Sequence, residues 1–464
     1  MSSTEESPMP EMPDFDPGLL PISPLYPPDP GLGLFSRAMP FFAHPHEFTG
    51  WQDETLSWKR TCYLSANLNP GPTTHIHGPD AIKFLSDVTA HSFANFPVGR
   101  CRHTVLTNDE GLVMTHGLAL HAAENEIHTY FLSPWLDWRA QGGSWDIELV
   151  DRTMDRFVFQ LAGPRCLEAL ESAAEADLHD LRFMAHGPAR IDGCDVRILR
   201  MGMGGTLSYE IHGDVDDAQR IYARVLSAGE PVGMRRLGWH SYANNHTENG
   251  YPQMDYHFQS CTQDPGLLEF LRMIGFDPDD WPNGTPLRGS SGTERSKRFR
   301  NPLQCNWDKA VSFDHEFPGK AALQREAEHP TRRTVTLVWN VEDVIDVYAS
   351  QFQREQDPYR FMEIPIEAMF GTAGGALYQD DVLDEHGNVV GCSSGREYSN
   401  YSRDMFSLGC IDVEKAELGT ELQILWGEPG TRQKKVRATV SKFPHLDLTP
   451  NYSYDVESIP RLGG

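Results

Sequence analysis

A short sequence pattern that occurs twice constrains this fold more than any other feature of the sequence. THIHGPDAIKFLSDV places a strand before Gly78 and a helix that starts at Pro79 and Asp80. About 85 residues later, FQLAGPRCLEALESA repeats the order of strand, Gly163, Pro164 and helix. Proline suits the first turn of a helix, where its missing N–H has no partner to lose, and an acidic side chain there favours the positive helix end. The repeat predicts two copies of one unit.

A pair of strands is expected after each copy. Residues 105–121, VLTNDEGLVMTHGLALH, and residues 197–213, RILRMGMGGTLSYEIHG, each contain two strand-like runs around a turn with glycine. Solenoid repeats would be shorter and more numerous, so we expect a duplicated α+β unit. The GMGG run at 202–205 lacks the spacing, the lysine and the strand–loop–helix context of a nucleotide-binding loop.

Length and composition bound the class of protein. The 464 residues suffice for two or three domains, and 39% apolar with 23% charged residues is typical of a soluble globular chain. The formal charge of 40 − 66 = −26 argues against nucleic-acid and membrane partners. Eight scattered cysteines show no metal-ligand spacing, and neither a signal peptide nor a bilayer-spanning run is visible. We therefore expect a cytoplasmic protein with free thiols and no metal.

The chain divides into four segments by composition. Prolines and acidic groups at the start oppose helix and strand pairing, so we expect an arm that either wraps the body or stays mobile, with the folded part beginning near Leu34. Short strand signals in the last third, such as TVTLVWN and ELQILWG, are separated by Gly and Asp turns and predict a small barrel or sandwich. The expected segments are an N-terminal arm at 1–32, a region of two α+β units at 33–300, a connection at 301–333 and a β-rich domain at 334–464.

The stretch GWHSYANNHTENGY, residues 238–251, is unusually rich in polar and aromatic side chains. It shows neither the apolar spacing of an amphipathic helix nor the alternation of a half-buried strand. Buried polar groups need partners, so such a stretch either is a solvated loop or lines a cavity where it meets a ligand. Tyr242, Asn245, His246 and Tyr251 are its candidate site residues.

Two further places carry candidate site residues. Glu210 lies in LSYEIHG among largely apolar neighbours, where a carboxylate either faces solvent or needs donors for both oxygens. The stretch FFAHPHEFTGW gathers Phe42, His44 and His46. Two histidines without a third ligand are a weak metal signal, so we expect this stretch to line a core or a pocket.

These motifs together resemble the glycine-cleavage T-protein (aminomethyltransferase) superfamily. The two Gly-Pro copies, LTNDEG, the strand with Glu210, the Tyr242–Gly250 run, NPL with FPGKAAL, and the terminal GNVVG and GTELQILWG follow the expected order from about residue 45 onward. Within it, VTLVWN and Tyr-x-x-Asn-x-x-Glu-x-Gly are most similar to tetrahydrofolate-dependent O-demethylases of the vanillate and 3-O-methylgallate type. The resemblance implies an α+β, T-protein-like fold with two folate-binding units and a C-terminal barrel-like domain.

The resemblance also implies residue roles. Tyr242 matches a tyrosine implicated in catalysis, and Glu210 matches a carboxylate that holds the pterin. The full set that the match implies is Tyr242 as the catalytic residue, Glu210, Gln160 and Tyr251 for the folate, and Phe42, Asn245 and His246 for the aromatic substrate.

Several positions depart from the family pattern. Thr115 and His116 stand where aminomethyltransferases carry an Asp pair, which disfavours glycine cleavage. Phe42 replaces a tyrosine at the pocket entrance. Ser133 stands near the place of a carboxylate-binding arginine, and Arg139 is not aligned with it, so the donor either lacks a carboxylate or is bound differently.

The implied reaction moves a methyl group from a methoxylated, lignin-derived aromatic to N5 of tetrahydrofolate, giving 5-methyltetrahydrofolate and a phenol. The enzyme must hold N5 and the methyl carbon at near-attack distance and neutralise the leaving oxygen. A tyrosine, with a reference pKa of about 10, can donate to a phenolate of similar basicity. Two alternatives stay open: a folate-dependent demethylase or aminomethyltransferase for a methylated amine or sulfonium compound, and a non-catalytic folate-binding protein.

Overall fold

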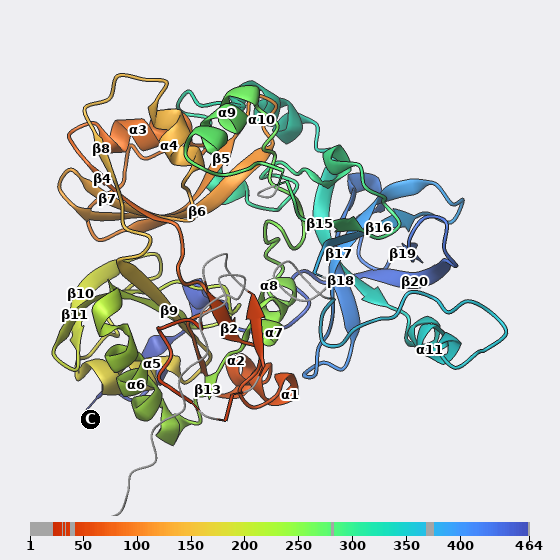
Figure 1. Cartoon of the computed structure of the whole chain (residues 1–464), viewed down its shortest axis with the longest axis horizontal. Coiled ribbons are helices and arrows are strands. Elements are labelled where there is room, and N and C mark those ends of the chain that lie inside the picture. Colours follow the sequence, from red (N-terminus) through yellow and green to blue (C-terminus); the bar gives the residue numbers. More distant parts are fainter. Residues whose placement is uncertain are drawn as a thin grey trace, which may run out of the picture.

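The computed structural model describes residues 22–29, 31–32, 34–37, 42–279, 283–367 and 375–462. Figure 1 shows two α+β lobes on one side and a barrel on the other, with the short helices α7 and α8 between them. Among the described residues, no helix combines the length and the apolar character that crossing a bilayer requires.

The first lobe is a five-stranded antiparallel sheet in the order β5-β6-β7-β4-β8. Its core is formed by apolar residues of the sheet and of three helices, among them Phe84, Leu136 and Leu267. The elements are β4 (Thr73–His77), α3 (Ala81–Val88), β5 (Cys101–Thr107), β6 (Val113–Ala123), β7 (Glu126–Tyr130), α4 (Trp135–Ala140), β8 (Glu148–Asp151) and α9 (Pro265–Met273).

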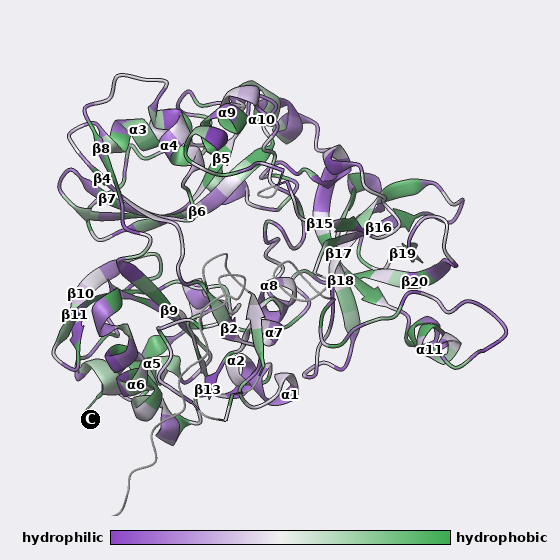
Figure 2. Ribbon diagram, in the orientation of Figure 1, coloured by the Kyte–Doolittle hydropathy of each residue, from purple (hydrophilic) through white to green (hydrophobic). Residues whose placement is uncertain are grey.

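The second lobe is a six-stranded sheet in the order β10-β11-β12-β9-β3-β13, in which only β13 pairs in parallel. Its two main helices carry apolar and polar residues side by side (Figure 2), and their apolar side chains join the core of the sheet. The elements are β3 (Tyr63–Ser65), β9 (Arg156–Ala162), α5 (Cys166–Ala174), β10 (His186–Ile191), β11 (Cys194–Leu199), β12 (Ser208–Asp214), α6 (Ala218–Gly229) and β13 (Arg235–Arg236).

The duplicated α+β unit is confirmed by the strand order. The series β5-β6-β7-β4-β8 and β10-β11-β12-β9-β3 match position by position, and each Gly-Pro turn joins β4 or β9 to its helix. Gly78 and Gly163 have φ of 132° and 128°, and a Cβ would lie 2.2 Å from the Asp146 carbonyl oxygen or 2.4 Å from that of Thr61. Both expected strand pairs are present, but they are not equivalent: residues 105–121 contain β5 and β6, whereas residues 197–213 contain β11 and β12, which match β6 and β7.

The C-terminal strands close into a barrel. The order β16-β17-β18-β15-β20-β19 is completed by pairing of β16 with β19, so six strands form a ring and the barrel prediction is confirmed. The strands are β15 (Arg332–Trp339), β16 (Leu377–Leu383), β17 (Val389–Tyr398), β18 (Met405–Asp412), β19 (Glu421–Trp426) and β20 (Lys434–Ser441). Strand β14 (Leu287–Arg288) adds to β16, and α10 (Lys320–Glu328) and α11 (Val341–Ser350) flank β15 along the chain.

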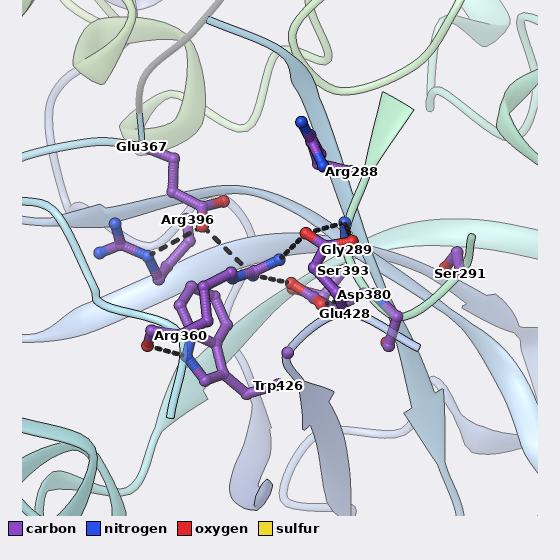
Figure 3. Close-up of polar contacts among 12 residues, drawn as sticks. Arg288, Gly289, Ser291, Arg360, Glu367, Asp380, Ser393, Arg396, Trp426 and Glu428 are labelled. Atoms are coloured by element: carbon purple, nitrogen blue, oxygen red, sulfur yellow. Dashed lines mark hydrogen bonds and ion pairs between the residues drawn. The ribbon is translucent and has the colours of Figure 1, made fainter. Parts of the chain in front are cut away.

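A partly buried cation organises one part of the barrel (Figure 3). The Arg360 guanidinium lies 2.5 Å from the Asp380 carboxylate, 3.2 Å from Glu367 and 3.4 Å from Glu428. It also lies 3.6 Å from the ring centre of Trp426. Three carboxylates and an aromatic face occupy this guanidinium, so we assign the cluster to holding the barrel together.

Part of the N-terminal arm packs against the second lobe. Leu25 and Tyr26 are only 4% and 7% exposed and belong to its core. The Tyr26 hydroxyl donates to Asn67 over 3.2 Å, and Asp29 forms an ion pair with Arg236. Residues 22–29 of the arm thus contact the body of the protein, because prolines oppose regular structure without preventing apolar side chains from packing.

Candidate functional site

The stretch singled out in the sequence forms two short helices, α7 (Trp239–Tyr242) and α8 (Asn244–Glu248). Every residue from Ser241 to Glu248 is buried. The solvated-loop alternative is therefore wrong, and so is the expectation of no helix. An amphipathic pattern needs a solvent-facing side, and the residues from Ser241 to Glu248 have none because protein surrounds them.

The same stretch contacts both lobes and the barrel. The Asn245 amide donates to the Tyr63 hydroxyl of β3 over 3.1 Å. The Thr247 hydroxyl donates to a carbonyl oxygen of β17 over 3.2 Å. The Tyr251 hydroxyl lies 2.9 Å from Nε2 of His103 on β5. A ligand bound here would be surrounded by all three parts of the fold.

Glu210 and Gln160 face each other across the second-lobe sheet. They are register partners on β12 and β9, and the Gln160 amide donates to Glu210 Oε1 over 3.0 Å. His212 Nε2 lies 2.8 Å from the other carboxylate oxygen. Both residues are buried, at 5% and 3% exposed, so the solvent-facing alternative for Glu210 is wrong. The Gln160 Oε1 atom is buried without a hydrogen-bond partner.

Tyr242 is close enough to Glu210, Tyr63 and Tyr251 to interact with them electrostatically. Its ring makes an edge contact with His246, with centroids 5.1 Å apart. Burial raises the pKa of Tyr242 well above its usual value, and nearby Tyr63, Glu210 and Tyr251 act in the same direction. The phenol is therefore protonated at neutral pH and can donate a hydrogen bond or a proton.

Two histidines join Tyr251 in a hydrogen-bonded triangle. His103 Nε2 lies 2.9 Å from the Tyr251 hydroxyl and 3.3 Å from His116 Nδ1, which in turn lies 3.4 Å from that hydroxyl. Trp307 packs against His116, with ring centres 4.6 Å apart. Burial lowers the pKa of His103 to about 3 and that of His116 well below its usual value, so both rings are neutral.

Sequence reasoning missed His103 and noted His116 only as a departure from the family pattern. Val105 pairs with His116 in the register of β5 and β6, which sets His103 diagonally opposite His116 on one face of the sheet. Only the register reveals this, because the two histidines are 13 positions apart in the chain.

Several polar atoms of the site are buried without a hydrogen-bond partner in the described structure. They include Asn245 Oδ1, His246 Nδ1, His116 Nε2 and the Tyr130 hydroxyl, in addition to Gln160 Oε1. Each such atom costs free energy in the absence of a partner, so the cluster suits a ligand that supplies donors and acceptors. A carboxylate beside an amide oxygen fits the N–H and amino groups along a pterin edge.

Phe42, Ser133 and Arg139 are the remaining positions that the sequence singled out. Phe42 is half-buried and directly precedes β2 (Ala43–Pro45), which pairs with β1 (Phe35–Arg37). Ser133 is bonded to Thr74 over 2.7 Å. Arg139 donates from Nη2 to a backbone carbonyl oxygen of β5 over 3.1 Å, and its buried Nε has no hydrogen-bond partner in the described structure.

One group near α7 has ligand types that a metal ion can use. His46, Glu47 and His240 each bring one such atom within 4.8 Å of the others, which supplies the third ligand that the sequence lacked. The His46 and His240 rings are stacked at 4.4 Å, and His240 Nδ1 lies 2.5 Å from Glu47. His46 Nδ1 is bonded to Ser36, so these contacts already brace α7 without an ion.

The chain is similar to several known proteins in sequence and in fold. Residues 35–265 match the GCVT N-terminal domain. A sesamin methylene transferase from Sinomonas sp. is 42% identical, over 92% of this chain and 96% of that protein. A syringate O-demethylase from Sphingobium sp. is 28% identical, over 86% and 89%. The structure of glycine cleavage system aminomethyltransferase T from Bartonella henselae superposes with a TM-score of 0.65 at 17% identity, over 90% and 95%.

Proposed function

The chain belongs to the aminomethyltransferase (glycine-cleavage T-protein) superfamily, and from this premise we propose that it is a tetrahydrofolate-dependent transferase that removes a one-carbon unit from an aryl ether oxygen. The superfamily resemblance and the α+β fold with a terminal barrel are thereby confirmed. The leading reaction is O-demethylation, in which a methoxylated aromatic gives a phenol and tetrahydrofolate becomes 5-methyltetrahydrofolate.

One observation carries the proposal: a protonated, buried Tyr242 lies in the same cluster as the Glu210–Gln160 pair. Glu210 and Gln160 would hold the pterin edge, and Tyr251 would lie along the folate. The acceptor nitrogen N5 of tetrahydrofolate supplies the lone pair that attacks the methyl carbon. Asn245, His246 and Phe42 would line the aromatic substrate.

Tyr242 performs the step that the leaving group requires. As the C–O bond breaks, its hydroxyl donates to the ether oxygen, which leaves as a phenol. A donor fixed in a water-poor site stabilises developing negative charge more strongly than water does. The proton that N5 loses on methylation balances the one taken by the phenolate.

Methylene transfer is a second candidate, supported by the similarity to the Sinomonas protein. In a methylenedioxy ring, one carbon is bonded to two aryl oxygens. Both C–O bonds break, N5 and N10 of tetrahydrofolate bond to the carbon, and their two protons pass to the oxygens. The products would be a catechol and 5,10-methylenetetrahydrofolate.

We also propose the division into an arm (1–32), a catalytic region (33–300), a connection (301–333) and a barrel domain (334–464). We further propose that the protein acts in the cytoplasm, that its partners are the small-molecule donor and tetrahydrofolate, and that it binds neither nucleic acid nor membrane. The net charge of −26 opposes nucleic-acid and membrane partners, and eight buried cysteines without a disulfide are typical of a reducing compartment such as the cytoplasm.

The test is to incubate the purified protein with tetrahydrofolate and matched methoxy- and methylenedioxybenzenes, and to follow the folate and aromatic products by mass spectrometry. Equal amounts of 5-methyltetrahydrofolate and a phenol support demethylation, whereas 5,10-methylenetetrahydrofolate and a catechol support methylene transfer. Product from methylated amines or sulfonium compounds alone would contradict the proposal. Tight folate binding with no product from any donor would indicate a non-catalytic folate-binding protein.

A further inference from the structure

The buried polar atoms around Tyr242 that lack a hydrogen-bond partner among the described residues belong to neutral groups. Asn245 Oδ1 is an amide oxygen, and His246 Nδ1 and His116 Nε2 belong to imidazoles. Burial lowers the pKa of His246 to about 4, and His103 and His116 are shifted in the same direction. These rings carry no positive charge at neutral pH. They can recognise hydroxyl and ether oxygens, but they provide no counter-ion.

The cations near the cluster already have protein partners. Lys59 forms a buried ion pair with Glu248 of α8. The Arg300 backbone carbonyl oxygen accepts a hydrogen bond from Val113 of β6, the strand that carries His116. Its guanidinium donates to Gln379 and Cys392. Arg156 is paired with the Asp214 carboxylate, whereas Arg139, Arg197 and Arg200 donate to neutral groups, which are the Thr107 carbonyl oxygen, His186 and Asn451.

Among the described residues, no Lys or Arg contributes to the pKa shifts of Tyr242, His246, His116 or Tyr251. One Lys or Arg of the sequence has a side chain that the structure does not describe. This residue is Arg37 in β1. Glu210 and the overall charge of −26 add a field that opposes an anionic donor. A benzoate carboxylate bound beside Tyr242 would therefore be buried without a counter-charge, which is costly.

We infer, resting on the proposed function, that the donor is an uncharged aromatic ether: a methoxy- or methylenedioxybenzene whose other substituents are neutral, and not a ring that carries a carboxylate. Neutral hydroxyl, ether or amide substituents would bond to Asn245, His246 and His116. Selectivity then arises from the cost of an uncompensated anion rather than from an attractive charge.

The test uses donors of one shape and two charges. Vanillate is compared with vanillamide, and piperonylate with piperonylamide, because each pair differs by a carboxylate and a primary amide on the same ring. The value of kcat/KM with tetrahydrofolate is measured for each, and equilibrium binding is measured by calorimetry with the folate-free protein. We expect the amides to exceed the acids by at least about 100-fold, since a buried unpaired charge costs several kcal/mol.

Equal or better use of the acids would overturn the inference and leave the proposed function intact. If no donor of either kind reacts, the proposed function fails, and the binding ratio of amide to acid still decides the inference by itself. The variant Arg37→Gln examines the one cation whose side chain is not described, with Arg190→Gln, exposed on the second lobe, as its control. An unchanged amide preference in both supports the inference. Loss of acid turnover in Arg37→Gln alone would identify a counter-ion and overturn it.

Discussion

At the scale of single residues, burial decides which form each titratable group takes. Tyr242 is held as a phenol because an ionised ring would have no water and would face Glu210. His246 is held as an uncharged imidazole for the same reason, with its pKa lowered to about 4. Tyr242 is thus a donor and His246 an uncharged neighbour over the ordinary range of pH.

Tyr242→Phe removes the donor while keeping the ring. We expect kcat/KM for the aromatic donor to fall by about 10²- to 10⁴-fold, the usual range for loss of a proton-transfer group, with folate affinity little changed. Product formation and folate titration measure the two effects. Tyr222→Phe is a matched control, because it removes the same hydroxyl from a tyrosine in the core of the second lobe, where that hydroxyl is buried without a partner among the described residues. Equal activity of the Tyr242→Phe and native proteins would exclude the assigned role.

Glu210→Gln tests the pterin contact. The neutral amide loses charge-assisted acceptance, so we expect tetrahydrofolate to bind about 10- to 100-fold more weakly. Calorimetry measures the dissociation constant. Asp214→Asn makes the same chemical change on the same strand at a largely exposed side chain, and should leave folate affinity unchanged. A variant of Glu210 that binds as tightly as the native protein would place the pterin elsewhere.

At the scale of elements, the predictable parts are those encoded locally. The two Gly-Pro turns were found from the sequence because glycine, proline and an apolar helix face lie within a few residues of one another. Helices α7 and α8 were not found from the sequence, because nearly all of their residues are buried and their apolar residues show no helical periodicity. The meeting of His103 with His116 depends on strand register, and the Arg360 cluster of the barrel depends on contacts between residues far apart in the chain.

Helix α8 is fixed by a buried ion pair. Lys59 contacts Glu248, whose carboxylate also accepts from Trp58 Nε1 over 3.0 Å and from Ser399 over 2.8 Å. These contacts join α2 (Ser57–Arg60), α8 and the segment after β17. The pair therefore links the site helix to the second lobe and to the barrel at once.

Glu248→Gln leaves the Lys59 ammonium buried without its carboxylate. We expect the free energy of unfolding to fall by about 3 kcal/mol, as for other broken buried pairs, and the Lys59→Met, Glu248→Gln double variant to recover part of that loss. Urea unfolding of the native protein and the single and double variants measures this cycle. Additive losses in the double variant would show that the two side chains do not interact.

At the scale of the whole molecule, the many buried neutral histidines make stability depend on pH. Burial lowers the pKa of His44 and His246 to about 4 and of His75, His103 and His128 to about 3. In the unfolded chain, each would take up a proton near its reference pKa of about 6.5. Between about pH 6.5 and 4 the unfolded state therefore binds more protons, and the free energy of unfolding falls as the pH falls.

Urea midpoints at pH 7.5, 6.5, 5.5 and 4.5 test this dependence. We expect little change between 7.5 and 6.5 and a progressively steeper loss below, to which the first lobe contributes most because His75, His103 and His128 lie on its strands. The variant His75→Gln should flatten the slope, since a glutamine takes up no proton in either state, whereas the exposed His386→Gln should leave it unchanged. A midpoint that is constant down to pH 4.5 would mean that these imidazoles take up protons in the folded protein as readily as in the unfolded chain. The neutral histidine surface inferred beside Tyr242 would then fail as well, because a charged His246 or His116 would supply the counter-ion that a carboxylated donor needs.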